Sequence, residues 1–260
     1  MPRSLAPISV CILLAALAST GYATPVDYGT FIGRTVIFQD VTDGSLAHLT
    51  PLFGAPITPI SGDSLWFAPS SFGASAGQGK TQTTAGTLSM LIAAMPGHDI
   101  DSITITEQGD YTLAGAKKSA GTYVSVVGTV VLTVLNVDGQ PISPMAVTMS
   151  LVYAPSSGDF NLRDDAKNGP WAGSTSIDVD RILAEANIHG EVTLLSLSLE
   201  NILTAVSETG TSVLIKKKGV GNTGLTGISV VGPTVPEPLT CVSFLALTGL
   251  LAWSRRWRAA

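Results

Sequence analysis

Short stretches in which apolar and polar residues alternate are the feature that most limits what this chain can fold into. Residues 102–106 read Ser-Ile-Thr-Ile-Thr, and residues 195–199 read Leu-Ser-Leu-Ser-Leu. Successive side chains of a strand point to opposite faces of its sheet, so this alternation predicts strands with one buried face. A longer candidate, residues 122–137, is rich in Val and Thr, and Gly128 within it predicts a bulge or a bend.

The rest of the pattern is also that of a β protein. Residues 179–186 read as a helix, with Asp178 as its N-cap and Gly190 just beyond its end. Many short strands with one short helix favour an antiparallel β-sandwich, jelly-roll-like or Ig-like. Further candidate strands are residues 31–38, 87–93, 146–153 and 213–218. Turn signals stand at residues 43–44, 109–110, 138–139, 157–159 and 209–210.

The N-terminal segment reads as a secretory signal peptide. Arg3 gives it a positive start, residues 8–18 form a short apolar run, and small residues lead up to Ala23. An apolar run of this length is too short to span a bilayer comfortably, and small residues are what a signal peptidase requires. We therefore predict a signal peptide over residues 1–23, cleaved after Ala23, and export of the rest of the chain.

The last 26 residues have three parts. Residues 235–238 read Val-Pro-Glu-Pro, residues 239–253 are apolar and carry no charge, and residues 254–260 form a basic tail. A helix of about 15 residues spans roughly 22 Å, which is short against a bilayer core of about 30 Å. We predict a short transmembrane helix over residues 239–253, with the basic tail as a stop on the cytoplasmic side. The basic residues of this tail are Arg255, Arg256 and Arg258.

The order of motif, apolar helix and basic tail is similar to the PEP-CTERM protein-sorting domain. The resemblance rests on Pro236, Glu237 and Pro238, and it covers the last 26 residues of the chain. It implies that exosortase, an integral-membrane enzyme, recognises the motif and cleaves near it, so that the helix anchors the protein only transiently. It further implies delivery of the ectodomain to the cell surface or the extracellular matrix, and an association with exopolysaccharide or biofilm.

Between these ends lies the exported part of the chain. Residues 24–218 are predicted to form the β-sandwich ectodomain, and residues 219–234 a Gly- and Pro-containing linker that could include a last strand at 228–231. The four arginines at the two ends leave 14 − 4 = 10 basic residues against 19 acidic ones, a net charge near −9. Such a charge argues against nucleic acid or anionic lipid as a partner. Because Cys11 and Cys241 lie in the two end segments, we expect no disulfide in the ectodomain.

Residues 70–86 are rich in Gly, Ser and Thr, and we interpret them as a flexible loop. Two motif matches fall inside this segment. Residues 74–81 fit a loose phosphate-binding loop with Ala74 in the first glycine position. Residues 73–77 match the Gly-x-Ser-x-Gly nucleophile elbow, and Asp178 and His189 follow in hydrolase order. Both motifs need a helix directly after the loop, and the sequence predicts none there. A secreted serine hydrolase therefore stays a third hypothesis.

Metal-binding chemistry is sparse in this sequence. The three histidines are widely separated and have no metal-ligand spacing. Three pairs of aspartates could supply oxygen ligands to a structural calcium ion, although none has the spacing of a known calcium loop. We therefore expect no cofactor and no catalytic residue, and leave structural calcium open. The three pairs are Asp99 and Asp101, Asp164 and Asp165, and Asp178 and Asp180.

Aromatic and basic residues give two further expectations. Trp66, Phe67 and Trp171 could stack on sugar rings if they were exposed on one sheet face, although isolated aromatic residues in β proteins more often belong to the core. Residues 216–218 are three consecutive lysines, which we interpret as a charged strand end that protects a sheet edge.

The leading hypothesis is a non-enzymatic surface or matrix protein that exosortase sorts and processes. A carbohydrate-binding β-sandwich module is the alternative.

Overall fold

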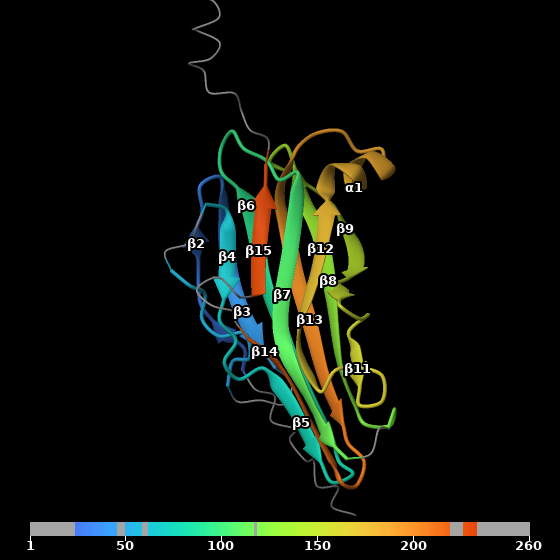
Figure 1. Ribbon diagram of the computed structural model, residues 1–260. Coiled ribbons are helices and arrows are strands. Elements are labelled where there is room, and N and C mark those ends of the chain that lie inside the picture. Colours follow the sequence, from blue (N-terminus) through green and yellow to red (C-terminus); the bar gives the residue numbers. More distant parts are fainter. Residues whose placement is uncertain (1–23, 46–49, 59–61, 117–118, 219–225, 233–260) are drawn as a thin grey trace, which may run out of the picture.

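The computed structural model describes residues 24–45, 50–58, 62–116, 119–218 and 226–232 (Figure 1). Over these residues the chain forms two antiparallel sheets that pack face to face, as the sequence predicts. The eight-stranded sheet contains β1 (Val26–Asp27), β2 (Phe31–Ile32), β3 (Val36–Gly44), β6 (Thr81–Ala94), β8 (Tyr123–Val137), β9 (Gln140–Ser150), β11 (Asp159–Asn161) and β13 (Val192–Val206). The seven-stranded sheet contains β4 (Ser64–Phe67), β5 (Gly73–Gly77), β7 (Ser102–Gly115), β10 (Val152–Ala154), β12 (Asn168–Asp178), β14 (Thr211–Lys217) and β15 (Thr226–Val231).

One long strand organises each sheet. In the eight-stranded sheet, β13 lies between β6 and β8 and pairs with both along most of its length. In the seven-stranded sheet, β7 pairs with β12 along one edge and with two strands, end to end, along the other. β15 pairs with residues 102–106 of β7, and β14 pairs with residues 109–115. Residue 107 therefore lies where β14 ends and β15 begins.

The predicted alternation is confirmed by the burial of the side chains. Ile103 and Ile105 are fully buried, and so are the leucines at 195, 197 and 199, while the residues between them face outward. The inward-facing residues of both sheets form one continuous hydrophobic core. A chain of this length is long enough to bury a single core of this kind.

The predicted helix is confirmed as α1 (Val179–Glu185), which directly follows β12 at one end of the sandwich (Figure 1). Asp178 is its N-cap, and its carboxylate accepts a hydrogen bond of 2.9 Å from the backbone N–H of Arg181. Among the described residues, no helix is long and apolar enough to cross a membrane.

The prediction that residues 70–86 form a flexible loop is wrong. Its residues form β5, a tight turn and the first part of β6, and β5 pairs with β14. Ala74 and Ala76 are buried and alternate with outward-facing neighbours. The small residues therefore belong to a strand whose inward face packs on the core through alanine. Gln78 and Gly79 have φ of 57° and 76°, so both central residues of the turn have positive φ, as a type I′ turn requires.

Two predictions based on glycine are also wrong. Gly109 lies inside β7 rather than in a turn. Glycine is needed there because a Cβ would collide with the Trp171 ring. Gly128 pairs with Asn201 in regular register, with neither a bulge nor a bend at that point. A Cβ on Gly128 would lie 2.6 Å from Tyr153 Oη and 2.7 Å from Asn201 Nδ2. Both glycines make room for large or polar side chains inside the sandwich.

Candidate functional sites

A groove on the outer face of the seven-stranded sheet is the first candidate site. It has a volume of about 420 Å³, and Trp66 of β4 forms one side of it. The groove crosses the strands β4, β15, β7, β12 and β10 in that order, because Trp66, Gly227, Thr106, Ser174 and Val152 are neighbours in register. Its outward-facing lining residues are Trp66, Thr106, Gln108, Val152, Ala154, Ala172 and Ser174. Glu107, Tyr153 and Gly173 also line it, from the buried, inward-facing positions of the same strands.

Trp66 is held in place by the strand beside it. A Cβ on Gly227 would collide with three carbon atoms of the Trp66 ring, so the indole lies flat against the backbone of β15. Leu65 and Phe67 on either side of Trp66 point into the core, which directs Trp66 outward and leaves it partly exposed. The result is a fixed, flat apolar surface at the edge of a groove.

The other two predicted stacking aromatics belong to the core. Phe67 is fully buried, and its ring packs against Phe53 at 6.5 Å between centroids. Trp171 is 2% exposed and packs edge-to-face against Tyr153 at 5.9 Å. Of the three aromatic residues that the sequence singles out, Trp66 is therefore the one placed to meet a ligand.

A polar cluster inside the core is the second candidate site. It consists of Lys217 of β14, Glu107 of β7, Asn201 of β13 and Tyr153 of β10, and we call it the buried polar cluster. Lys217 Nζ donates to Glu107 Oε2 and to Asn201 Oδ1. The other carboxylate oxygen of Glu107 accepts from Tyr153 Oη at 2.5 Å and from Asn201 Nδ2 at 3.1 Å.

The electrostatics of this cluster follow from its burial. The side chains of Lys217 and Glu107 are both completely shielded from solvent. Burial lowers the pKa of the Lys217 amine, and the neighbouring Glu107 carboxylate opposes that shift. Burial also raises the pKa of the Tyr153 hydroxyl, and the charge of Glu107 adds to that shift.

This cluster corrects the sequence interpretation of the three lysines. Lys216 is exposed, as a charged strand end would be, but Lys217 faces the core. Lysine is almost never buried without a partner, and here the partner lies on a strand about 110 residues earlier in the chain. No local sequence pattern predicts that Lys217 pairs with Glu107.

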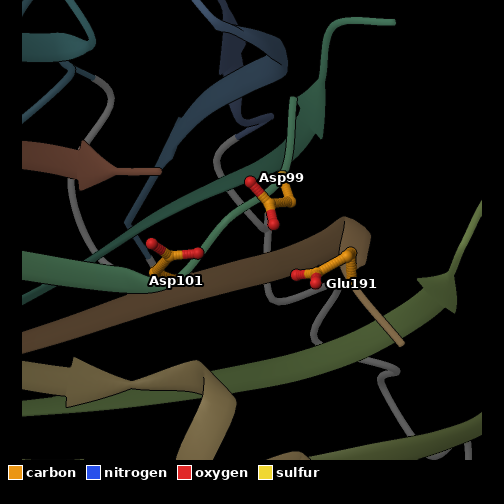
Figure 2. A group of neighbouring side chains, drawn as sticks. All are labelled: Asp99, Asp101 and Glu191. Atoms are coloured by element: carbon orange, nitrogen blue, oxygen red, sulfur yellow. The ribbon is translucent and has the colours of Figure 1, made fainter. Parts of the chain in front are cut away.

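The third candidate is an acidic cluster at the end of the sandwich that carries α1. Asp99 and Asp101 lie on the segment that enters β7, and Glu191 lies directly before β13; Figure 2 shows the three side chains converging. One carboxylate oxygen from each lies within 4.8 Å of the others. Asp99 is 7% exposed, and its Oδ1 has no hydrogen-bond partner among the described residues.

The pKa values of Glu191, Asp101 and Asp180, at and beside the acidic cluster, are raised. The pKa of Glu191 is raised to about 7, mainly by its hydrogen bond with Asp99 and the charge of that residue. Burial is the main cause that raises the pKa of Asp101 and of Asp180, with contributions from neighbouring aspartates. Three converging carboxylates are a set of oxygen ligands of the kind that Ca²⁺ takes.

The three predicted aspartate pairs therefore have different surroundings. Asp99 and Asp101 come together with Glu191, which the sequence did not single out. The charge of Asp180 contributes to the raised pKa of Asp101 and of Glu191. The pair at 164–165 lies elsewhere: Asp164 pairs with Arg163 at 2.8 Å, and Asp165 accepts from the backbone N–H of Asn161.

The two motif matches in residues 73–81 do not have the structure they would need. Ser75 lies within β5 rather than on a strand-to-helix turn, and its Oγ donates to Gln82 Oε1 at 3.3 Å. β5 lies at the end of the sandwich opposite α1, near which Asp178 and His189 are found (Figure 1). Neither match assembles a phosphate-binding loop or a hydrolase triad.

The predicted sorting residues lie outside the described residues. These are Ala23 at the signal-peptide boundary, the motif residues Pro236, Glu237 and Pro238, and the basic stop Arg255, Arg256 and Arg258.

No protein-family model matches this chain, and no curated protein matches it either. Among solved structures, TmCBM61 in complex with β-1,4-galactotriose is 7% identical, with a TM-score of 0.21 over 65% of this chain and 69% of that one. CBM28, a carbohydrate-binding module specific for non-crystalline cellulose, is 14% identical, with a TM-score of 0.22 over 62% of this chain and 82% of that one. Endoglucanase 3 of family GH12 from Trichoderma harzianum is 7% identical, with a TM-score of 0.21 over 83% of this chain and 100% of that one. TM-scores this low carry no argument about function.

Proposed function

We propose that this chain is an exported, non-enzymatic surface protein whose β-sandwich binds a neutral polysaccharide along the groove beside Trp66. The observation that carries the proposal is the partly exposed indole of Trp66 at the edge of that groove. The indole lies flat there because Gly227 beneath it has no side chain. Sugar rings have apolar faces that pack on aromatic rings, and such sites combine one or more flat aromatics with a few polar groups.

Polar side chains of the right kind lie beside the indole. Gln108 and Thr106 line the groove, and next to it Ser64, Ser229, Thr104 and Ser176 form a row of hydroxyl groups across the same face. Adjacent strands are about 4.8 Å apart, so a groove that crosses five strands is roughly 19 Å long. That length accommodates several sugar rings of one chain.

The net charge of the ectodomain favours a neutral polysaccharide as the ligand over an acidic one. A net charge near −9 repels acidic polysaccharides at low ionic strength, and thus favours neutral ones.

Affinity electrophoresis through gels that contain the host's own exopolysaccharide, a soluble β-1,4-glucan or a β-1,4-galactan tests this proposal. Retardation of the wild-type protein by one of them is expected, and Trp66→Ala should weaken binding about tenfold, or about 1.4 kcal/mol. Tyr123→Ala removes a partly exposed aromatic from the other sheet and serves as the matched control. Equal retardation of Trp66→Ala and wild type would contradict the assignment of the groove.

The sorting part of the proposal rests on the C-terminal resemblance. Glu237, held between two prolines, is the charged residue of the motif, and exosortase is the partner that would recognise it. Mass spectrometry of the mature C-terminus, with and without the host's exosortase, tests this step. We expect a shortened C-terminus in the wild-type host and an uncut one after Glu237→Ala, whereas an intact end at Ala260 in the wild-type host would reject processing.

A further inference from the structure

The buried polar cluster brings an amine, a carboxamide and a carboxyl group into contact. Lys217 offers a primary amine, Asn201 offers a carboxamide, and Glu107 contacts both. An amine can attack the carbon of an amide when the amine is unprotonated and a neighbouring group moves the protons. The three residues come from three strands and from both sheets, so the fold itself brings these groups together.

The surroundings exclude water from this cluster. Asn201 is 0% exposed, and the rings of Phe53 and Phe72 have their centroids 5.0 and 5.1 Å from Lys217 Nζ. Glycines stand on both sides of Asn201, because it pairs with Gly128 on β8 and with Gly86 on β6. A side chain at Gly128 would occupy the space of the Asn201 amide itself.

We propose that Lys217 and Asn201 react with each other after folding and form an intramolecular isopeptide bond, with Glu107 as the group that transfers protons. The bond joins β14 of one sheet to β13 of the other through the middle of the core. It forms without any enzyme, oxidant or cofactor.

The atoms of this reaction balance as follows. The neutral amine of Lys217 attacks Cγ of Asn201, and a new N–C bond forms. Glu107 takes the proton that the amine loses and passes it to Nδ2 of Asn201. The bond between Cγ and Nδ2 then breaks, and one molecule of ammonia leaves. The product is a secondary amide between the two side chains, and nothing is oxidised or reduced.

The structure lowers the barrier to this reaction in two ways. Burial lowers the pKa of Lys217, which favours the neutral, nucleophilic amine. The contacts to Glu107 and Asn201 hold amine, carboxyl and amide in one place, so the entropy of bringing them together is lost on folding and not in the reaction. Tyr153, which donates to Glu107, positions the carboxyl group.

A bond at this position would act like a disulfide in a domain that has none. The exported region between the predicted end segments contains no cysteine. Asn201 and Lys217 are 16 residues apart in the chain, and the bond closes the β13–β14 connection into a loop. Closing a loop reduces the entropy of the unfolded chain and ties the two sheets together.

Peptide mapping of the denatured full-length chain tests the proposal. Cleavage after glutamate separates residues 201–208 from the peptide that begins at residue 209 and carries Lys217. The isopeptide bond predicts one branched species, lighter by about 17 Da than the two peptides together because ammonia has left. Two linear peptides with unmodified Asn201 and Lys217, obtained from folded wild-type protein, would overturn the proposal.

Matched variants separate the roles of the residues. Lys216→Arg changes the exposed neighbour of Lys217 and should leave the branched species in place. Lys217→Met and Glu107→Gln should each give two linear peptides. A branched species in Glu107→Gln would overturn the proton-transfer role of Glu107. Should either variant fail to fold, the wild-type digest still decides whether the bond exists.

Discussion

Asp43 is the residue whose replacement should have the clearest effect on the stability of the sandwich. The residue is 2% exposed, and its carboxylate accepts hydrogen bonds from the backbone N–H groups of Leu52, Phe53 and Gly54, at 3.2, 2.7 and 3.1 Å. Asp43→Ala leaves three donors without an acceptor, each at a cost of about 1–3 kcal/mol. Because Gly54 is only partly buried and can reach water, the two buried donors dominate, and we expect a total loss of roughly 2–6 kcal/mol.

Urea unfolding followed by circular dichroism measures this loss as a change in the free energy of unfolding. Asp43→Asn keeps one acceptor oxygen and should lose less than Asp43→Ala. Asp27→Ala is the control, because Asp27 makes the same kind of bond, 2.7 Å to Gly29 N, at an exposed position, and should change stability by about 0.5 kcal/mol or less. A loss below about 1 kcal/mol for Asp43→Ala would refute the reasoning that these bonds hold the loop.

Three further outcomes are expected. Gly227→Ala should weaken polysaccharide binding as Trp66→Ala does, because the added methyl group displaces the indole; unchanged retardation in the gel would show that the position of the indole does not matter. The pKa of Glu191 is raised from 4.5 to about 7, so between these two pH values the folded state holds a proton that the unfolded state has lost. In buffer with EDTA, the free energy of unfolding should therefore fall as pH rises from about 5 to 8. This carboxyl is exposed and screened, so the fall should be about 1 kcal/mol, and Glu191→Gln should abolish it in thermal melts. Gly128→Ala should lower the free energy of unfolding by about 1–3 kcal/mol, since its Cβ would lie 2.6 Å from Tyr153 Oη; no change in urea unfolding would mean that the core can relax there.

The residues of the buried polar cluster could have been found from the sequence, because each lies in the inward-facing register of its strand. Glu107 follows Ile103 and Ile105 at the spacing of two, and Lys217 follows Val213 and Ile215 in the same way. A polar residue in the buried register of a strand is a signal that a partner exists. What the sequence could not supply is the identity of that partner, because it lies on a strand that is distant in the chain.

The sandwich and its helix followed from alternation and capping, since both are local properties of the chain. Glycine misled the prediction where its role was set by a neighbouring strand. Gly109 and Gly128 resemble turn or bulge residues in the sequence, yet each gives space to its paired residue on the neighbouring strand of the same sheet, Trp171 and Asn201 respectively. The direction in which Trp66 points was likewise predictable from alternation, but the groove beside it depends on which strands become neighbours.

The most direct test of the account is the response of the two tryptophans of the sandwich to oligosaccharides. In ¹⁵N-edited NMR spectra each indole N–H gives its own signal, and Trp66→Phe identifies which signal belongs to Trp66. We predict that oligosaccharides of the polysaccharide that retards the protein shift the Trp66 signal, and that the signal of Trp171, which is 2% exposed, stays in place. An unmoved Trp66 signal at saturating oligosaccharide, or equal shifts of both signals, would contradict binding at the groove.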